Sequence, residues 1–363
     1  MDALCWNHPA ISLKATQNSE NHGFLTPKSS SSLFHCRAAM NSSNPVSKPS
    51  PLKIQNRMFI LGMGFVGQFF AQELKYSGWD VSGTCRNLGQ KMQLEGRGFD
   101  VYVFDANDPV QDTLKAMKYH THLLISIPPD VDVGDPLLHH EKLLRTTLQG
   151  GDLRWLCYLS STSVYGDYGG AWVDEDNPAN PLSRSGKLRI EAEERWINLG
   201  NDLGFSTQVF RLGGIYGPGR RHWFNHSAID TIIKQRSLSE RQQRRARRQF
   251  TSRVHVQDIC QALKACIQRP SSRRFYNIVD DDPAPREEVF SYARDLVEKK
   301  WPGKFDTLLK PVEESDVTNG SVRGDKRVCN ARMKRELGVS LAYPTYKSGL
   351  QSIIDQMGDE EPS

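Results

Sequence analysis

The residues with the clearest chemistry are three glycines, Gly62, Gly64 and Gly67, in the segment RMFILGMGFVGQFFAQEL. Their G-x-G-x-x-G spacing follows a short apolar run and opens an amphipathic one, which predicts a strand, a tight turn and a helix. Gly62 would permit the turn, Gly64 would let a pyrophosphate approach the backbone, and Gly67 would let the helix pack on the strand. The N–H groups at the helix start, around Phe65 and Val66, favour a bound phosphate. The segment therefore predicts a dinucleotide-binding site.

The end of the next apolar run, WDVSGTCRN, indicates which dinucleotide is bound. A site for NAD usually carries an acidic residue there to hold the ribose 2′-hydroxyl, whereas this chain has Arg86. An acid would repel a 2′-phosphate, and an arginine can bind one with two parallel hydrogen bonds. We therefore predict NADP as the cofactor, with a solvated surface arginine as the alternative interpretation of Arg86.

The elements that must position these residues alternate along the chain. Apolar runs predict further strands, and amphipathic runs predict helices between them; the strands are expected at 79–87, 98–105, 122–129 and 154–161, and the helices near 108–118 and 137–149. Such alternation with near-continuous apolar strands is typical of an α/β fold with a doubly wound parallel sheet. Ligands of such sheets bind at the carboxyl ends of the strands. We therefore expect the glycine turn, Arg86, Asp105 and residues 160–163 around one crevice, with Asp105 contacting the cofactor.

The run YLSSTSVYGDYGGAWVDE (158–175) resembles the strand-end motif of the extended short-chain dehydrogenase/reductases, which include nucleotide-sugar epimerases. Further similar segments follow in the family's order: RLGGIYGPGR (211–220), SRVHVQDICQAL (252–263) and FYNIVDDDPAPREEV (275–289). The resemblance covers about residues 57–355 and is nearest to the atypical branch, epimerase-like NAD(P)-binding proteins of bacteria and plastids. It implies a Rossmann sheet with a smaller, interleaved C-terminal substrate-binding region.

The resemblance also implies catalytic positions, one of which has changed. Ser161 falls at the family's Ser/Thr, which polarises a substrate oxygen, and Lys187 falls at the lysine that binds the nicotinamide ribose. The catalytic tyrosine, four residues before the lysine, is replaced by Ser183. A serine hydroxyl is far too weak an acid to donate the proton without another base. Tyr168, in the loop DYGG, could reach the nicotinamide and is a third catalytic candidate; Tyr165 is most often structural in this family.

Several neighbouring residues carry weaker predictions. Asp174 and Glu175 are paired acids that could transfer protons, although adjacent side chains point different ways. Arg211 and Arg220 are separate candidates for an anion site. His222 and Trp223, in the loop that follows, are predicted to face the substrate. The helix that begins near Leu182 is expected to stop at Gly200.

One strongly basic segment, Lys234 to Arg253, carries eight basic residues and one acid, and without it the chain is slightly acidic. It could be a solvated helix or loop, or it could contact an acidic substrate or the cofactor. Nucleic acid is not favoured, because Phe250 is the single aromatic residue there for base stacking. The expected partner is therefore a small-molecule substrate that could be anionic; a homodimer could also form.

Composition bounds the remaining choices. The chain has 363 residues, 38% of them apolar, and no apolar run approaches the ~20 residues that cross a membrane. Its seven cysteines show neither a C-x-x-C pair nor zinc spacing. We therefore expect buried thiols such as Cys85 and Cys157, a reducing compartment and no metal site; His139 and His140 are interpreted as helix surface.

The first fifty residues differ from the rest, with ten serines, four Lys/Arg and two acids. This composition matches an organellar transit peptide, more a chloroplast than a mitochondrial one, and a disordered tail is the alternative. We expect residues 1–51 outside the fold, an NADP-binding Rossmann domain over 52–212 completed by about 252–280, a substrate-binding region over 213–251 and 281–357, and a tail over 358–363.

The predicted function is that of an NADP-dependent oxidoreductase acting on a carbonyl or alcohol in the chloroplast stroma. Two alternatives stay open at this point. One is a nucleotide-sugar epimerase, which would favour tightly held NAD. The other is a cofactor-binding sensor or scaffold without catalysis, because Ser183 replaces the tyrosine.

Overall fold

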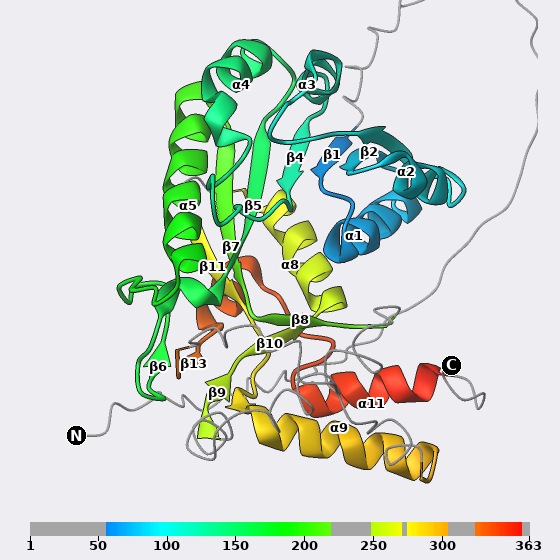
Figure 1. The fold of residues 1–363 in the computed structure, drawn as a ribbon, viewed down its shortest axis with the longest axis vertical. Coiled ribbons are helices and arrows are strands. Elements are labelled where there is room, and N and C mark those ends of the chain that lie inside the picture. The colour runs from blue at the N-terminus through cyan, green and yellow to red at the C-terminus, as the bar shows by residue number, and fades with distance from the viewer. Residues whose placement is uncertain (1–55, 219–247, 271–273, 304–323, 358–363) are drawn as a thin grey trace, which may run out of the picture. The chain divides into compact units, whose positions relative to one another are not determined.

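Seven parallel strands form the central sheet of the protein (Figure 1). The structure is a computed structural model that describes residues 56–218, 248–270, 274–303 and 324–357. The strand order is β11-β7-β5-β4-β1-β2-β3, and every neighbouring pair is parallel. The strands are β1 (Arg57–Leu61), β2 (Asp80–Cys85), β3 (Asp100–Val103), β4 (His122–Ile125), β5 (Trp155–Ser161), β7 (Ser206–Leu212) and β11 (Arg274–Ile278).

Helices cover both faces of this sheet, as the doubly wound prediction requires. On one side lie α1 (Phe65–Tyr76) and α8 (Val256–Gln268). On the other lie α3 (Gln111–Lys118), α4 (Glu141–Leu148) and α5 (Arg184–Leu203). A further helix, α2 (Leu88–Glu95), follows β2, and short 3-10 turns span η1 (Leu138–His140) and η2 (Thr162–Tyr165). The prediction of an α/β Rossmann sheet is confirmed.

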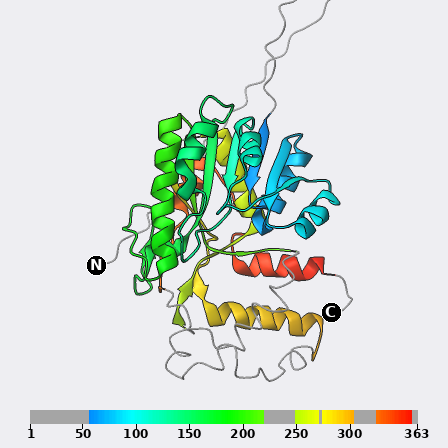
Figure 2. The ribbon, with the colours of Figure 1, turned by 45° about the horizontal axis from the view of Figure 1, so that its top comes forward.

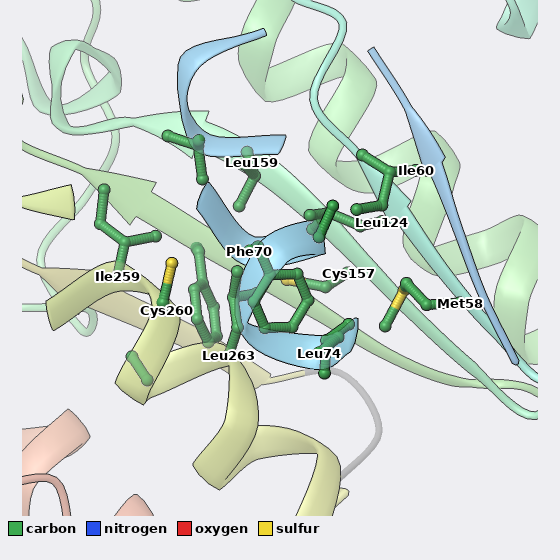
Figure 3. Packing of buried hydrophobic residues seen from close by; sticks show 14 of the residues in the cluster. Met58, Ile60, Phe70, Leu74, Leu124, Cys157, Leu159, Ile259, Cys260 and Leu263 are labelled. Carbon is green, nitrogen blue, oxygen red and sulfur yellow. The ribbon is translucent and has the colours of Figure 1, made fainter. Parts of the chain in front are cut away.

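The alternation of side chains along β1 shows how the two cores form. Met58 and Ile60 point to the core that holds α1 and α8, whereas Phe59 and Leu61 point to the core of α3, α4 and α5. All four side chains are fully buried. Figure 3 shows the first core, where Met58 and Ile60 lie with Phe70 and other apolar residues of α1 and α8. Because successive side chains of a strand point to opposite faces, a continuous apolar run suits a strand buried on both sides.

A second group of elements lies beyond the carboxyl edge of the sheet (Figures 1 and 2). Helices α9 (Arg286–Lys300) and α11 (Tyr346–Gln356) pack on each other through a third apolar cluster. Short paired strands connect this part to the sheet: β8 (Gly214–Tyr216) with β10 (Arg253–His255), β9 (Phe250–Thr251) with β12 (Ala284–Pro285), and β6 (Trp172–Val173) with β13 (Arg327–Val328). A single π turn spans η5 (Met333–Leu337). The proposed division into cofactor and substrate regions stays a prediction.

The end of α5 corrects one expectation from the sequence. The helix does not stop at Gly200 but continues to Leu203, and Gly204 follows in the left-handed conformation with φ of 78°. Gly200 is buried, and a Cβ there would clash with the hydroxyl of Thr207 on β7. Its lack of a side chain therefore serves the close packing of helix on strand, while Gly204 provides the helix end.

Several expectations fall on residues that the structure does not describe. These include residues 1–51, Arg220, His222, Trp223 and most of the basic segment. Within the described ranges, no helix is both long and apolar enough to span a membrane. Cys85 and Cys157 are buried free thiols, as expected.

Candidate functional site

The glycine turn between β1 and α1 has the geometry that its spacing predicts. Gly62 has φ of 96°, in the region that favours glycine. A Cβ there would also lie 3.2 Å from the Ile127 side chain. A Cβ on Gly67 would lie 2.6 Å from the Gly62 carbonyl oxygen, so the start of α1 packs directly on the turn. Both glycines are required by the chain's own packing.

Gly64 differs, because its missing side chain leaves open space. No described atom lies within 4 Å of the position that a Cβ would take. Gly64 is also the N-cap residue of α1, and within the described chain no side chain caps that helix end. Open space before a helix N-terminus fits a dinucleotide pyrophosphate, because the N–H groups there point outward and carry partial positive charge. The side chain of Val66 is buried and that of Phe65 packs on Phe69, so these residues could offer only their backbone to a ligand.

The turn is also tied to the neighbouring strand β2. The N–H of Gly62 donates to the hydroxyl of Thr84 at 2.9 Å, and the N–H of Met63 donates to the Thr84 carbonyl at 2.7 Å. Thr84 is fully buried. These bonds hold the glycine turn beside the end of β2, and Arg86 is the first residue after that strand. Thr84 was not singled out from the sequence, although a polar residue in an apolar strand is a detectable signal.

Arg86 and Asp105 lie where the sequence predicts, after the carboxyl ends of β2 and β3. Both side chains are exposed. Within the described residues the Arg86 guanidinium has no carboxylate partner, whereas the Asp105 carboxylate accepts the N–H of Asn107 at 2.9 Å. Arg86 is therefore available to an anion, and Asp105 stabilises its own loop. Their roles toward a cofactor stay predictions.

A cavity of about 570 Å³ opens near the carboxyl end of β5. Residues from six separate segments line it. They are Ser161 to Ser163 with Gly166; Leu182, Ser183 and Ser185; Gly213 to Ile215; Phe250 to Arg253; Arg286, Val289 and Phe290; and Gly324, Lys326 and Val328. The wall therefore combines the end of β5 with elements of the C-terminal part.

Ser161 is the residue of this wall that the sequence predicts best. It is the last residue of β5 and the N-cap of the following 3-10 turn, and its hydroxyl oxygen accepts the N–H of Ser163 at 3.2 Å. The hydroxyl hydrogen can then point into the cavity toward a substrate oxygen. Ser160 points the other way and donates to Glu193 in the core. Strand alternation thus selects Ser161 as the accessible hydroxyl.

Ser183 lies on the same cavity wall, at the start of α5. It is the N-cap residue, and its hydroxyl oxygen accepts the N–H of Gly186 at 3.1 Å. Lys187 is in the first turn of that helix, exposed, and it is not among the cavity-lining residues. The residue in the tyrosine position therefore stabilises a helix end, and the structure does not bring Lys187 to the cavity.

The two tyrosines of the following loop are engaged elsewhere. The hydroxyl of Tyr168 donates to the Pro178 carbonyl at 2.6 Å, and Tyr168 does not line the cavity. Its catalytic role stays a prediction that this placement does not favour. Tyr165 is fully buried and donates to the Asn277 side chain at 2.8 Å. Burial raises the pKa of Tyr165 to about 12, consistent with its expected structural role.

Two other candidates, Arg211 for an anion site and Glu175 for proton transfer, have buried side chains and do not line the cavity. Arg211 is buried and forms an ion pair with Glu193 at 2.7 Å, so its guanidinium is not available to an anion. Glu175 is buried below the loop, and its carboxylate accepts the N–H of Asn277 at 2.7 Å. Burial raises the pKa of Glu175, against the effects of this hydrogen bond and of Arg332. The carboxylates of Glu193 and Glu175 therefore stabilise the structure around the cavity.

The cavity is also lined by cations, of which sequence reasoning missed Lys326 and Arg286. Lys326 is 8% exposed, and its ammonium donates to the Gly166 carbonyl at 2.9 Å. Burial lowers the pKa of Lys326. Arg253 and Arg286 line the same cavity, whereas no described acidic residue does. The sequence offered no cue for Lys326, because it meets Gly166 across 160 residues.

A buried acid lies behind one of these cations. The N–H of Asp280 donates to the Arg253 carbonyl at 2.7 Å. Burial raises the pKa of Asp280 to about 8, although the charge of Arg253 opposes the shift. No group of three or more His, Cys, Asp or Glu suited to a metal ion is found in the described part of the chain.

Comparison with known proteins places this fold and site in a family. Protein YeeZ of Escherichia coli is 28% identical over 298 residues, which cover 79% of this chain and 96% of YeeZ. The structure of a functionally unknown conserved protein from Silicibacter pomeroyi is similar, with 33% identity, a TM-score of 0.65 and coverage of 83% and 99% of the two chains.

A UDP-glucuronic acid 4-epimerase from Bacillus cereus, solved in complex with NAD, shares the fold with a TM-score of 0.59 at 17% identity; the match covers 82% of this chain and 96% of that one. Residues 58–279 match the model of the NAD dependent epimerase/dehydratase family. They span the glycine turn, Ser161 and all seven strands of the sheet except the first residue of β1. The chain therefore belongs to the NAD dependent epimerase/dehydratase family.

Proposed function

We propose that the protein is an NADP-dependent oxidoreductase that interconverts a carbonyl and an alcohol on a small molecule. The observation that carries this proposal is the open space at Gly64, on the same sheet edge as the cavity that Ser161 lines. The nicotinamide would supply or accept the hydride. The Ser161 hydroxyl would donate a hydrogen bond to the substrate oxygen and so stabilise the charge that develops there.

The preference for NADP over NAD rests on Arg86. Its side chain is exposed beside the glycine turn, and no acidic residue follows β2 directly. The Bacillus cereus epimerase was solved with NAD, which supports a nicotinamide dinucleotide as the cofactor of this fold. It does not distinguish NAD from NADP, which differ in the 2′-phosphate. Calorimetric titration with NADPH and NADH tests the choice, with Arg86→Ala as the variant and Arg335→Ala as an exposed control. We expect NADPH to bind at least about tenfold tighter, with the difference lost only in Arg86→Ala. Equal affinities in the wild type would contradict the preference.

The substrate class proposed is an anionic carbonyl compound, one that carries a carboxylate or a phosphate. Arg253, Arg286 and Lys326 surround the cavity, and none of the described lining residues is acidic. Such a site concentrates anions through its positive potential. Pairs of carbonyl compounds that differ in one carboxylate or phosphate should separate by at least about tenfold in kcat/KM, in favour of the anion. Arg286→Gln should reduce that ratio, and equal rates for both members of each pair would contradict this class.

A second candidate function, a cofactor-binding sensor, is favoured by the use of Ser183 as a helix cap rather than as a free acid. The two functions differ in turnover. A protein that binds NADPH but converts no carbonyl or alcohol would support the sensor. An epimerase would instead retain NAD through purification, and this would be visible in the absorbance of the denatured supernatant.

We further propose that residues 1–51 direct the protein to the chloroplast stroma. The serine-rich, acid-poor composition of this segment supports the proposal. Import into isolated chloroplasts should shorten the full chain and protect it from added protease. A chain lacking residues 1–51 should remain outside.

A further inference from the structure

One ammonium group lies on the cavity wall of an enzyme that lacks the tyrosine its family uses. We propose that Lys326 is the proton-transfer residue, the part that Ser183 cannot perform. The inference rests on the proposed oxidoreductase function and adds a catalytic residue to it. It is carried by the position of Lys326, by the other residues of the wall and by the charges around the ammonium.

The position of Lys326 connects it to the catalytic strand end. Its ammonium donates to the carbonyl of Gly166, at 2.9 Å, and Gly166 ends the 3-10 turn that Ser161 begins. Lys326, Ser161 and Ser183 all line the one cavity. An ammonium has three N–H donors, so donors beyond the one used by Gly166 remain for a substrate oxygen.

The other residues of the wall cannot easily exchange a proton near neutral pH. Arg253 and Arg286 keep their protons, because a guanidinium does not lose its proton in proteins near neutral pH. The remaining polar groups of the described lining are serine and threonine hydroxyls, which are very weak acids. A lysine can serve, because its pKa falls readily when the amine is buried.

The surroundings of Lys326 favour such a fall. Burial lowers the pKa of Lys326, and the nearby Asp167 and Asp325 oppose this effect only in part. Both carboxylates also accept backbone N–H groups: Asp167 from Gly169 at 2.9 Å and Asp325 from Phe250 at 2.8 Å. Among the described residues, neither forms an ion pair with Lys326. Arg253 and Arg286, the other charged groups of the wall, add like charge to the cavity.

The chain around Lys326 is held by the loop that follows the catalytic turn. The N–H groups of Tyr168 and Gly170 donate to the Asp325 carbonyl at 2.9 and 3.1 Å. The next residues form β13, which pairs with β6. The backbone that bears the ammonium is therefore fixed relative to Ser161, as a proton-transfer group requires.

The step balances as follows for reduction of a carbonyl. The C=O π bond would break as its oxygen took a proton from the Lys326 ammonium, and one N–H bond of Lys326 would break. A bound reduced nicotinamide would supply the hydride to the carbon and be oxidised, so that one C–H bond and one O–H bond would form. Lys326 is left as a neutral amine, which regains a proton from water; oxidation of an alcohol uses the amine as the base.

The first test needs no substrate. In protein labelled with 13C at lysine Cε, NMR titration follows each amine, and the Lys326 signal is the one lost in Lys326→Arg. We expect the Lys326 signal to titrate at a lower pH than a lysine of a model peptide, because burial disfavours the charged amine. A Lys326 midpoint equal to or above that of the model peptide would overturn the proposal.

The second test separates proton transfer from simple charge. Lys326→Met removes the ammonium, whereas Lys326→Arg keeps a cation that cannot release its proton. Against a panel of carboxylated and phosphorylated carbonyls, both variants should lose at least about 100-fold in kcat. Their NADPH affinity should stay within about threefold of the wild type, and Lys115→Met should match the wild type throughout.

The outcomes distinguish this inference from the proposed function. Wild-type turnover in Lys326→Arg would assign Lys326 to anion binding. This result would overturn its role in proton transfer and leave the proposed oxidoreductase function standing. A wild type that binds NADPH but reduces nothing in the panel would remove the catalytic assignment and favour the sensor. A wild type that binds neither NADPH nor NADH would remove the proposed function and this inference together.

Discussion

The proposed reaction site has two ends on one edge of the sheet: the glycine turn, proposed to bind the pyrophosphate, and the cavity that Ser161 lines. The glycine turn is one continuous segment, 61–67, and it would bind its ligand through backbone groups. The reaction end assembles residues from six segments, including Ser161, Ser183 and Lys326. Backbone geometry depends on local sequence, whereas the side-chain wall depends on the tertiary fold.

This difference explains how the tyrosine can be absent while the glycine turn is intact. Within the turn, Gly62 and Gly67 are fixed by contacts inside the chain as well as by any ligand. At the reaction end, the position of Ser183 needs only a group that caps α5. A proton-transfer group can then come from another segment that reaches the same cavity. Packing inside the chain therefore restricts the residue types of the glycine turn, whereas the cavity wall can take its proton-transfer group from more than one segment.

The largest effect that would test the comparison is expected at Gly64. Gly64→Val places a branched side chain in the open space before α1. We expect NADPH affinity to fall at least about 100-fold, because the pyrophosphate can no longer approach the backbone. The melting temperature should stay within about 2 °C of the wild type, since the change costs less than about 1 kcal/mol where nothing is displaced.

Gly62→Val provides the matched control for that experiment. Its φ of 96° and its contact with Ile127 should destabilise the fold by at least about 2 kcal/mol as well as abolish binding. Tight NADPH binding in Gly64→Val would show that the phosphate lies elsewhere.

The next effect concerns the reaction end. Ser161→Ala should lower kcat about 100-fold, because it removes the hydrogen bond that strengthens as charge develops on the substrate oxygen. NADPH affinity should not change. Ser163→Ala, a neighbour on the same wall, keeps its backbone N–H and should retain wild-type turnover. Equal rates for Ser161→Ala and the wild type would remove Ser161 from the catalytic step.

What could be predicted from the sequence follows the same division. The strand, turn and helix around Gly62 to Gly67 are encoded by consecutive residues, so apolar periodicity and glycine spacing were enough. The doubly wound sheet followed from repeated alternation along the chain. Ser161 was found because a strand end and a family motif coincide there.

The rest could not be predicted, because it depends on contacts between distant segments. Lys326 contacts Gly166 across 160 residues, where the pairing of β13 with β6 and the bonds to the Asp325 carbonyl bring the two segments together. Arg211 has the sequence features of an anion-binding residue, yet Glu193 on α5 neutralises it within the core. Gly200 and Gly204 both suit a helix end, and only the packing of α5 on β7 decides between them.

A pH-dependent effect on stability is expected from Asp280, the acid behind the cavity. Asp280 has a pKa of about 8 in the fold and about 3.9 in an unfolded chain. Between these values the folded protein keeps a proton that the unfolded chain has lost. This group's contribution to stability is therefore complete below about pH 4 and is lost as the pH rises toward 8.

Asp280→Asn should remove that pH dependence. Denaturant titrations at several pH values should show the variant gaining stability over the wild type by up to about 1.4 kcal/mol per pH unit between pH 4 and 8. The difference should level off above pH 8. Asp108→Asn, at an exposed position, is the control. A constant difference between variant and wild type across this range would show that Asp280 is ionised in the fold.

The smallest effect sharpens the comparison most at the reaction end. Ser183→Ala removes the hydroxyl that accepts the Gly186 N–H, and we expect it to lower the free energy of unfolding by about 1 kcal/mol. Thr345→Ala, which removes the cap of α11, should cost about the same and serves as the matched control. If Ser183 is only a cap, kcat at saturating NADPH should stay within about threefold of the wild type in both variants. A 100-fold loss of kcat confined to Ser183→Ala would instead assign proton transfer to Ser183, at the position of the missing tyrosine. Loss of a helix cap should affect kcat equally in the two variants, so it could not explain such a difference.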